Sequence, residues 1–341
     1  MHQRVENQNR QLILAGDVGG TKTRLALFSI SKKATRLLRE KVFPSQRYPS
    51  LEAILEEFLG RSPQLGAVGV GVPGPIIGGM VKATNLPWAV HLQSLERTCG
   101  IREVGLINDL VAHAYGLLAL KKNDLETIHP GRKKEGTIAL IAPETGLGAA
   151  ILFWDGQRHL PSPSEGGHVD FAPRTPLEID LFRYLGRQFG HVSYERISSG
   201  TGLGHIYRFL RDSRRFGREP AWLARKMENE DPAAVITTMA RQQKNQLCSK
   251  ALDMFTSIFG AAAGNLALTA MALGGVYLGG GIPPKIIWKL KEGTFLRAFQ
   301  DKGRLTDFVG QIPVQVIMND RAALLGAASY AKGLLKATSE E

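Results

Sequence analysis

Two segments far apart in the chain repeat one plan: an apolar run, a glycine-rich turn that carries a threonine, and a second apolar run. The first is GDVGGTKTRLALF at Gly16–Phe28, and the second is APETGLGAAILFW at Ala142–Trp154. Each pattern predicts a β-hairpin whose turn presents backbone N–H groups, and consecutive N–H groups bind anions. One such turn in each of two lobes predicts a ligand held between duplicated halves. Because any two hairpins look alike at this level, the chemistry of the turns has to carry the interpretation.

Short apolar runs alternate with helical patterns along the 341 residues, which predicts an α/β fold with mixed sheets. We expect strands at residues 12–15, 25–28, 68–72, 104–107, 137–141, 149–153, 276–278 and 314–318, and helices at 51–59, 110–120, 177–189 and about 250–273. No segment approaches the ~18 consecutive apolar residues of a membrane span. The N-terminal stretch MHQRVENQNRQ is polar and lacks the apolar core of a signal peptide, so we expect a frayed lead-in and a cytoplasmic protein.

The cysteines and the charge limit the possible functions. Two cysteines, Cys99 and Cys248, form no C-x-x-C pair, which excludes a disulfide framework and a cysteine zinc site and predicts buried thiols in a reducing compartment. The net charge of +12 raises the alternative of a nucleic-acid binder, whose binding would depend strongly on salt. The densest basic stretch, Arg208–Lys226, also contains acidic and apolar residues at helical spacing, which predicts a solvated helix face. We therefore expect no nucleic-acid partner and no membrane partner.

The first turn has the composition of a phosphate-binding loop. Its glycines allow close approach of the backbone to a phosphate, and the carboxylate of Asp17 would repel that phosphate unless a divalent cation stood between them. Asp17 is therefore a candidate anchor for Mg²⁺, through water. The motif is not a Walker A loop, because that loop requires glycine where Thr21 stands. A plain hairpin turn is the alternative. The predicted nucleotide-binding residues here are Gly16, Asp17, Val18, Gly19, Gly20 and Thr21.

Two further glycine-rich segments extend the predicted nucleotide site. In the second turn, Thr145 and Gly146 would contact the β- and γ-phosphates. Gly279, Gly280 and Gly281 follow an apolar strand and precede a helical stretch, so bare backbone there could lie against a flat adenine. Each glycine-rich motif alone is an ambiguous sign of nucleotide binding, but three of them in this order are much less ambiguous.

A strand-end carboxylate is the candidate for acid–base chemistry. The expected strand at 104–107 leads into Asn108 and Asp109, directly before a helical pattern. One of the two residues could simply cap that helix. A kinase, however, needs a carboxylate that accepts the proton of the attacking hydroxyl, which is the role we predict for Asp109. The amide of Asn108 could hold neighbouring hydroxyls through its donor and its acceptor.

Three more polar residues are candidates for recognising a polyol. Glu165 and His168 flank two glycines in SEGGH; a metal site is the alternative, but two ligands without a third are weak support for one. Glu195 lies in YERISSG, and a surface pair with Arg196 is its alternative role.

The order of these motifs resembles the bacterial glucokinase family of the zinc-free branch, across nearly the whole chain. The resemblance rests on GDVGGTKTRLAL, LINDLVAHAYG, SEGGHVDF, YERISSGTGL, AAAGNLALTAMALGGVYLGGGIPPK and PVQVIMNDRAALLGAA. It implies a two-lobed, actin-like ATPase fold of the ribonuclease-H-like type, with mixed sheets and an interlobe cleft. It also implies transfer of the γ-phosphate of ATP to the 6-hydroxyl of D-glucose, with Mg²⁺, in a homodimer. We expect a small lobe at residues 1–119 plus 319–341 and a large lobe at 120–318.

The resemblance also assigns roles to residues, and two departures bear on them. It implies that Asp109 is the catalytic base, that Asn108, Glu165, His168 and Glu195 bind the sugar, and that the three glycine-rich segments bind the nucleotide. Lys22 and Glu144 stand where the family has a small polar residue and a glycine. A carboxylate at Glu144 could weaken donor binding or turn outward.

Three alternatives to this function remain open from the sequence. A kinase for mannose, fructose or glucosamine would use the same polar residue types. A sugar-sensing protein of the same fold would bind sugar without releasing ADP. The donor could also be ADP or polyphosphate instead of ATP.

Overall fold

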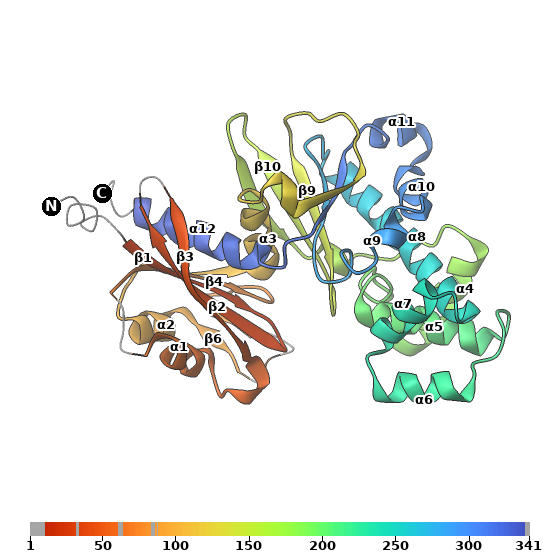
Figure 1. Ribbon diagram of the computed structural model, residues 1–341. Coiled ribbons are helices and arrows are strands. Elements are labelled where there is room, and N and C mark those ends of the chain that lie inside the picture. Colours follow the sequence, from red (N-terminus) through yellow and green to blue (C-terminus); the bar gives the residue numbers. More distant parts are fainter. Residues whose placement is uncertain (1–10, 32–33, 61–63, 83–85, 87, 338–341) are drawn as a thin grey trace. The chain divides into compact units, whose positions relative to one another are not determined.

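The computed structural model describes residues 11–31, 34–60, 64–82, 86 and 88–337, so the expected lead-in at residues 1–10 lies outside the described residues. The chain divides into two compact units (Figure 1). The first unit comprises Met1–Lys122 and Asn319–Glu341, and the second comprises Asn123–Met318.

The first unit is built on a five-stranded mixed sheet with the strand order β3-β2-β1-β4-β7. The strands β1, β2 and β3 are antiparallel, whereas β4 and β7 run parallel to β1. The strands β5 and β6, which lie between β4 and β7 in the sequence, form a separate two-stranded sheet. The bounds are β1 Gln11–Val18, β2 Lys22–Ile30, β3 Thr35–Pro44, β4 Leu65–Val72, β5 Met80–Val81, β6 Val90–His91 and β7 Val104–Asn108.

Helices cover both faces of this sheet because alternate strand residues point to opposite sides. Leu14 packs in a core with the helices α1 (Leu51–Leu59) and α2 (Leu92–Cys99). Its neighbours Ile13 and Ala15 pack in a second core with α12 (Ala322–Ala337). The helix α3 (Asp109–Leu117) follows β7 directly and packs against α12 (Figure 1).

The second unit is built on a six-stranded mixed sheet with the order β11-β10-β9-β12-β13-β8. Its central strands β9, β12 and β13 are parallel, and β10, β11 and β8 extend it with antiparallel pairings. The strands are β8 Leu125–His129, β9 Ile138–Pro143, β10 Leu147–Trp154, β11 His159–Ser164, β12 Gly275–Leu278 and β13 Val314–Ile317. The helices are α4 Pro176–Phe189, α5 Gly200–Ser213, α6 Ala221–Asn229, α7 Pro232–Arg241, α8 Gln246–Thr269, α9 Ile287–Leu290, α10 Thr294–Gln300 and α11 Thr306–Val309.

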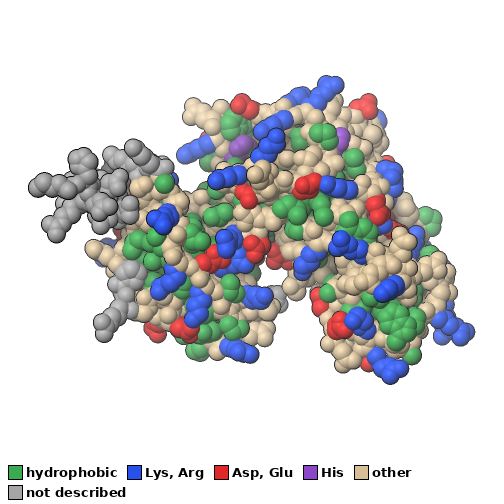
Figure 2. Space-filling view, in the orientation of Figure 1, with side chains coloured by type: hydrophobic (Ala, Val, Ile, Leu, Met, Phe, Trp, Pro, Cys, Tyr) green, Lys and Arg blue, Asp and Glu red, His purple; other side chains and the backbone are tan. Residues whose placement is uncertain are grey.

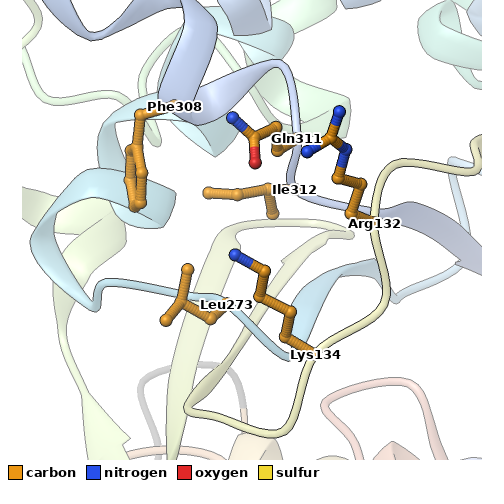
Figure 3. Close-up of a pocket in the computed structure, with 6 residues that line it drawn as sticks. All are labelled: Arg132, Lys134, Leu273, Phe308, Gln311 and Ile312. Carbon is orange, nitrogen blue, oxygen red and sulfur yellow. The ribbon is translucent and has the colours of Figure 1, made fainter.

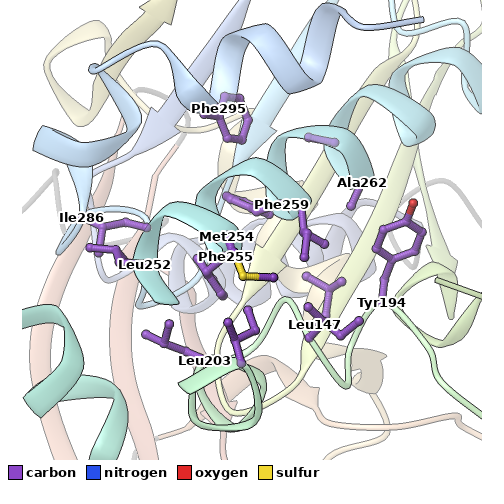
Figure 4. Packing of buried hydrophobic residues seen from close by; sticks show 14 of the residues in the cluster. Leu147, Tyr194, Leu203, Leu252, Met254, Phe255, Phe259, Ala262, Ile286 and Phe295 are labelled. Carbon is purple, nitrogen blue, oxygen red and sulfur yellow. The ribbon is translucent and has the colours of Figure 1, made fainter. Parts of the chain in front are cut away.

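The long helix α8 forms the centre of the core of the second unit. Phe255 and Phe259 on this helix are fully buried, and Phe295 of α10 packs edge-on against Phe259 with ring centroids 5.3 Å apart (Figure 4). By length and composition α8 could cross a membrane, but 72% of its apolar window is buried inside the protein. Its apolar character is therefore explained by the core.

The structure confirms the predicted fold class and both hairpins. The strands β1 and β2 pair antiparallel around the first glycine-rich turn, and β9 and β10 pair antiparallel around the second. The predicted solvated helix face over Arg208–Lys226 is divided between two helices. The helix α5 ends at Ser213, Arg214 adopts a left-handed φ of 56°, and α6 begins after Pro220.

Candidate active site

The first glycine-rich turn joins β1 to β2 and is held from the side by the segment that follows β3. The N–H of Gly19 donates to the carbonyl of Lys22 across the turn at 2.9 Å. Ser45 donates its N–H to the carbonyl of Thr21 at 3.0 Å and its hydroxyl to the carbonyl of Gly19 at 2.7 Å. These bonds occupy carbonyl oxygens of the turn, which leaves a loop suited to presenting N–H groups to an anion. The side chain of Lys22 is exposed there.

Asp17 lies at the carboxyl end of β1, in register with Arg24 of β2 and Gly71 of β4. Burial lowers the pKa of His113 below its ordinary value, and the negative charge of Asp17 partly offsets this effect. For Arg24, burial acts in the same direction, but the hydrogen bond to Asp320 and the nearby acidic charges, Asp17 among them, outweigh it and raise the pKa. A carboxylate oxygen beside an anion-binding turn suits Mg²⁺. In the part of the chain that the structure describes, no three His, Cys, Asp or Glu side chains are arranged so that they could hold a metal ion. A magnesium ion held by Asp17 would take its other ligands from phosphate oxygens and water.

Asn108 and Asp109 stand where β7 passes into α3. The side-chain oxygen of Asn108 accepts from the N–H groups of Leu110 at 2.9 Å and Val111 at 3.3 Å, so the capping alternative is confirmed for Asn108. Its amide nitrogen donates to the carbonyl of Gly74 at 3.3 Å. Asp109 is the half-buried first residue of α3, and its carboxylate accepts from the N–H of Leu110 at 2.9 Å. The carboxylate therefore lies at the end of a buried strand, as the sequence predicts.

The second turn, Glu144–Gly146, is held by the amino end of α5. The N–H of Gly200 donates to the carbonyl of Glu144 at 2.7 Å, and the hydroxyl of Thr201 donates to the carbonyl of Thr145 at 3.3 Å. Sequence reasoning missed this role of Gly200 and Thr201. The signal was the serine before Gly200, because a serine before a helical pattern is typical of an N-cap. Ser199 does cap α5, accepting from the N–H of Gly202 at 3.0 Å.

The predicted adenosine-side loop lies against this second turn. Gly279 donates its N–H to the carbonyl of Ile141 in β9 at 2.9 Å. Gly280 has a φ of +77°, and a Cβ there would lie 2.7 Å from the carbonyl oxygen of Pro143 and 2.8 Å from Cγ of Glu144. Glycine is therefore required at this position, both for the backbone conformation and for the close approach. The fold thus brings two of the three predicted nucleotide-binding segments into contact.

The carboxylate of Glu144 lies in this same group of loops. Desolvation raises its pKa, and the nearby positive charge of Lys285 partly offsets the effect. The residue keeps an exposed surface. The Cγ of Glu144 lies beside Gly280, so the side chain begins next to the adenosine-side loop.

The three predicted sugar-binding residues of the second unit lie together. His168 stands between the two carboxylates: its Nε2 is 3.8 Å from Oε2 of Glu165, and its Nδ1 is 3.8 Å from Oε1 of Glu195. The side chains are 59% exposed for His168 and 67% for Glu165. Polar groups that are this open can exchange water for the hydroxyls of a sugar.

This sugar cluster (Glu165, His168 and Glu195) is packed against the second turn. A Cβ on Gly167 would lie 1.8 Å from the carbonyl oxygen of Leu147, so only glycine permits the approach. The carbonyl of Gly167 accepts from the N–H of Glu195 at 2.8 Å. The alternative pairing of Glu195 with Arg196 is wrong, because the Arg196 guanidinium lies 4.3 Å from the ring centroid of Phe189.

Two cavities lie away from these loops. A cavity of about 30 Å³ lies at the amino ends of the parallel strands β9, β12 and β13, between Arg132, Leu273 and Ile312 (Figure 3). It is too small for a sugar, and ligands of α/β sheets bind at the carboxyl ends of strands. A larger cleft of about 400 Å³ lies among α7, α8 and α9, where Lys289 already pairs with Asp253 at 2.6 Å and Glu292 at 2.5 Å.

The basic residues and the two cysteines were the remaining features singled out in the sequence. Lys and Arg side chains are scattered among acidic ones over the face shown in Figure 2. Cys248 is buried and Cys99 is half-buried. Burial raises the pKa of Cys248 to about 12 and that of Cys99 to about 11, so both thiols stay protonated at neutral pH.

A sugar kinase needs anion-binding turns for its donor and open polar side chains for its acceptor, and this chain carries both in a mixed α/β fold. The class is therefore that of the hexose kinases. The family model described as Glucokinase matches residues 14–334, and the chain belongs to the glucokinase family.

Individual relatives agree with this membership. The chain is 38% identical over 342 residues to a glucokinase from a Nostoc species, with 95% of this chain and 99% of the relative covered. It is 38% identical over 339 residues to the glucokinase of Nostoc punctiforme, with the same coverage. Among solved structures, a glucokinase from an Antarctic psychrotroph matches with a TM-score of 0.81 and 32% identity, covering 95% of this chain and 99% of the other. The family predicted from the sequence is thereby confirmed.

Proposed function

We propose that this protein transfers the γ-phosphate of ATP to the 6-hydroxyl of D-glucose and releases glucose 6-phosphate and ADP. Membership of the glucokinase family supports the reaction. The observation that carries the proposal is the contact between the sugar cluster and the second turn, where Gly167 lies directly against Leu147. A hexose held by Glu165, His168 and Glu195 would thus stand next to a loop suited to bind the phosphates of the donor.

Each side chain has a defined task in this proposal. Asp109 accepts the proton of the attacking hydroxyl, and Asn108 positions that hydroxyl while it caps α3. The N–H groups of Gly20 and Thr21 in the first turn, and of Thr145 and Gly146 in the second, stabilise the charge that develops on the phosphoryl group. Gly279–Gly281 receives the adenosine. When bound, Mg²⁺ would neutralise phosphate charge, and Asp17 would hold its water ligands.

The wider setting follows from the family. We assign the two units as the small and large lobes of the kinase, and we propose a homodimer that works in the cytoplasm. Sedimentation of the purified protein would test the dimer.

The test of the function is formation of glucose 6-phosphate from glucose and Mg-ATP, measured through coupled NADPH production. Mannose, fructose and glucosamine are compared with glucose through coupled ADP release, and ADP and polyphosphate are compared with ATP as donors through the amount of glucose 6-phosphate formed. Fastest turnover with glucose and ATP is expected. Glucose binding without ADP release would refute the kinase and favour a sugar sensor.

A further inference from the structure

We propose that Glu195 links the sugar to the phosphate turn, so that binding of the hexose organises the loop that receives the donor. The inference rests on the proposed function and assigns to Glu195 a second role, as a positioning residue for the turn. It predicts that glucose and nucleotide strengthen each other's binding through this one carboxylate.

The two oxygens of the Glu195 carboxylate face different partners. Oε1 lies 3.8 Å from Nδ1 of His168, within the sugar cluster. Oε2 accepts a hydrogen bond from the backbone N–H of Leu147 at 3.1 Å, at the point where the second turn passes into β10. A Cβ on Gly146 would lie 2.4 Å from Oε2, so any larger residue at position 146 would displace this carboxylate.

The backbone at both ends of this link is fixed. Leu147 and Tyr194 are 5% and 4% exposed, and both side chains belong to the core around α8 (Figure 4). The hydroxyl of Tyr194 accepts from the amide of Asn265 at 2.9 Å. The carbonyl of Glu195 accepts from the hydroxyl of Ser199 at 2.7 Å. Because the backbone is held on either side, the freedom that remains is that of the Glu195 side chain and of the exposed tip of the turn.

Sugar binding restricts the conformations of the Glu195 side chain and of the exposed tip of the turn. A hydroxyl that donates to Oε1 selects one rotamer of Glu195, and the same rotamer presents Oε2 to Leu147. Because the backbone of Leu147 is already held by the core, the ordered carboxylate acts on the tip of the turn: Oε2 lies directly against Gly146 and so restricts Gly146 and its neighbour Thr145. The donor phosphate then binds a loop that is already ordered, so its binding no longer includes the entropy cost of ordering that loop. The result is positive coupling between the two sites. Coupling of this kind is reciprocal, so nucleotide strengthens sugar binding by the same factor.

The test is a binding cycle with glucose and a non-hydrolysable ATP analogue plus magnesium. Titration calorimetry gives the dissociation constant of each ligand with and without the other, and their ratio is the coupling factor. We expect a factor of about ten or more in the parent, the size of a charge-assisted hydrogen bond. In Glu195→Asp and Gly146→Ala it should fall to about two or less, because the first shortens the reach and the second displaces Oε2.

Glu165→Ala is the matched control. Glu165 contacts His168 at the same 3.8 Å as Glu195 does, and the described hydrogen bonds give it none to the second turn. This variant should weaken glucose binding and keep the coupling factor of the parent within about twofold. A coupling factor that survives in Glu195→Asp and Gly146→Ala, or that Glu165→Ala loses equally, would overturn the link.

A spectroscopic measurement separates the link from general damage. Carbonyl-labelled glycine with ¹⁵N-labelled leucine restricts the NMR spectrum to amides of Gly–Leu steps, among them Leu147. Glucose alone should shift the Leu147 amide in the parent and in Glu165→Ala, but not in Glu195→Asp. A parent that makes no glucose 6-phosphate refutes the proposed function, whereas one that makes it with a coupling factor of 1 refutes only the link.

Discussion

Gly116 of α3 lies so close to Ala322 of α12 that a Cβ on Gly116 would be 1.8 Å from the Ala322 carbonyl oxygen. The reverse contact is equally close, because a Cβ on Gly326 would be 1.7 Å from the carbonyl oxygen of Ala112. Two helices from distant parts of the chain therefore cross backbone against backbone. Since α3 begins with Asp109, this crossing fixes the helix that carries the proposed base.

Substitution of Gly116 by alanine should destabilise the protein by about 1–3 kcal/mol, because the added methyl group forces the two helices apart. The free energy of unfolding in urea measures the effect. Gly333 of the same α12 is the control, since a Cβ there meets nothing within 4 Å. Gly333→Ala should be neutral or gain about 0.5–1 kcal/mol from helix propensity. Equal stability of the two variants would contradict the close backbone contact between α3 and α12 at Gly116.

Replacement of Asp109 by asparagine should lower kcat by at least ~10²-fold, because the amide cannot take the proton of the sugar hydroxyl. The side-chain oxygen of asparagine can still accept the N–H of Leu110, so the melting temperature should change little. Steady-state kinetics at saturating glucose and Mg-ATP measure kcat. Glu56→Gln, at an exposed acid of the same unit, should keep the parental rate. Parental turnover by Asp109→Asn would remove Asp109 from the role of base.

The sequence was sufficient for the central strands and for both hairpins, because apolar runs and turn glycines are local signals. It did not predict β3 or β11. The strand β3 is an edge strand whose residues are mostly exposed, so it lacks an apolar run. The strand β11 is also an edge strand and contains Pro161 and Pro163, which read as a loop in sequence.

The candidate site shows the same division between local and distant information. A strand-end aspartate and glycine-rich turns can be identified within a few residues of sequence. The proximity of Glu195 to His168 cannot be identified in this way, because it depends on a hydrogen bond from the N–H of Glu195 to the carbonyl of Gly167, which is distant in the chain. Family resemblance supplied these residues, and only the fold showed the bond between Glu195 and Leu147.

Glu144 lies in the second turn, at a position where the family resemblance leads us to expect a glycine. Glu144→Gln removes a negative charge beside the loops that would bind the nucleotide, so the KM for Mg-ATP should fall about two- to fivefold, the size of one exposed charge interaction. The KM for glucose and kcat should stay within about twofold of the parent. The difference should shrink at high salt, because salt screens charges. Glu135→Gln, at an exposed acid in the loop before β9, is the control. A raised KM for Mg-ATP in Glu144→Gln would show that the carboxylate assists the donor.

Lys302 gives the second unit a measurable pH dependence. Its ammonium donates to the carbonyl of Ala261 at 3.2 Å and to the side chain of Asn265 at 2.8 Å. Burial lowers the pKa of Lys302 to about 8, and the positive charge of Arg174 acts in the same direction. The unfolded chain has the ordinary lysine value of 10.5. The folded protein therefore loses this proton at a lower pH than the unfolded chain does.

Between about pH 8 and pH 10.5 the unfolded state binds more protons than the folded state, so this group makes stability rise with pH. Below about pH 8 both states hold the proton, and the group adds no slope. The difference in free energy of unfolding between the parent and Lys302→Met should thus be flat from pH 7 to 8 and move in favour of the parent above it. Urea unfolding at a series of pH values measures the difference, and Lys244→Met, at an exposed lysine, should show no such trend. A difference that is constant up to pH 10, or that moves against the parent, would mean that Lys302 keeps its charge in the folded protein.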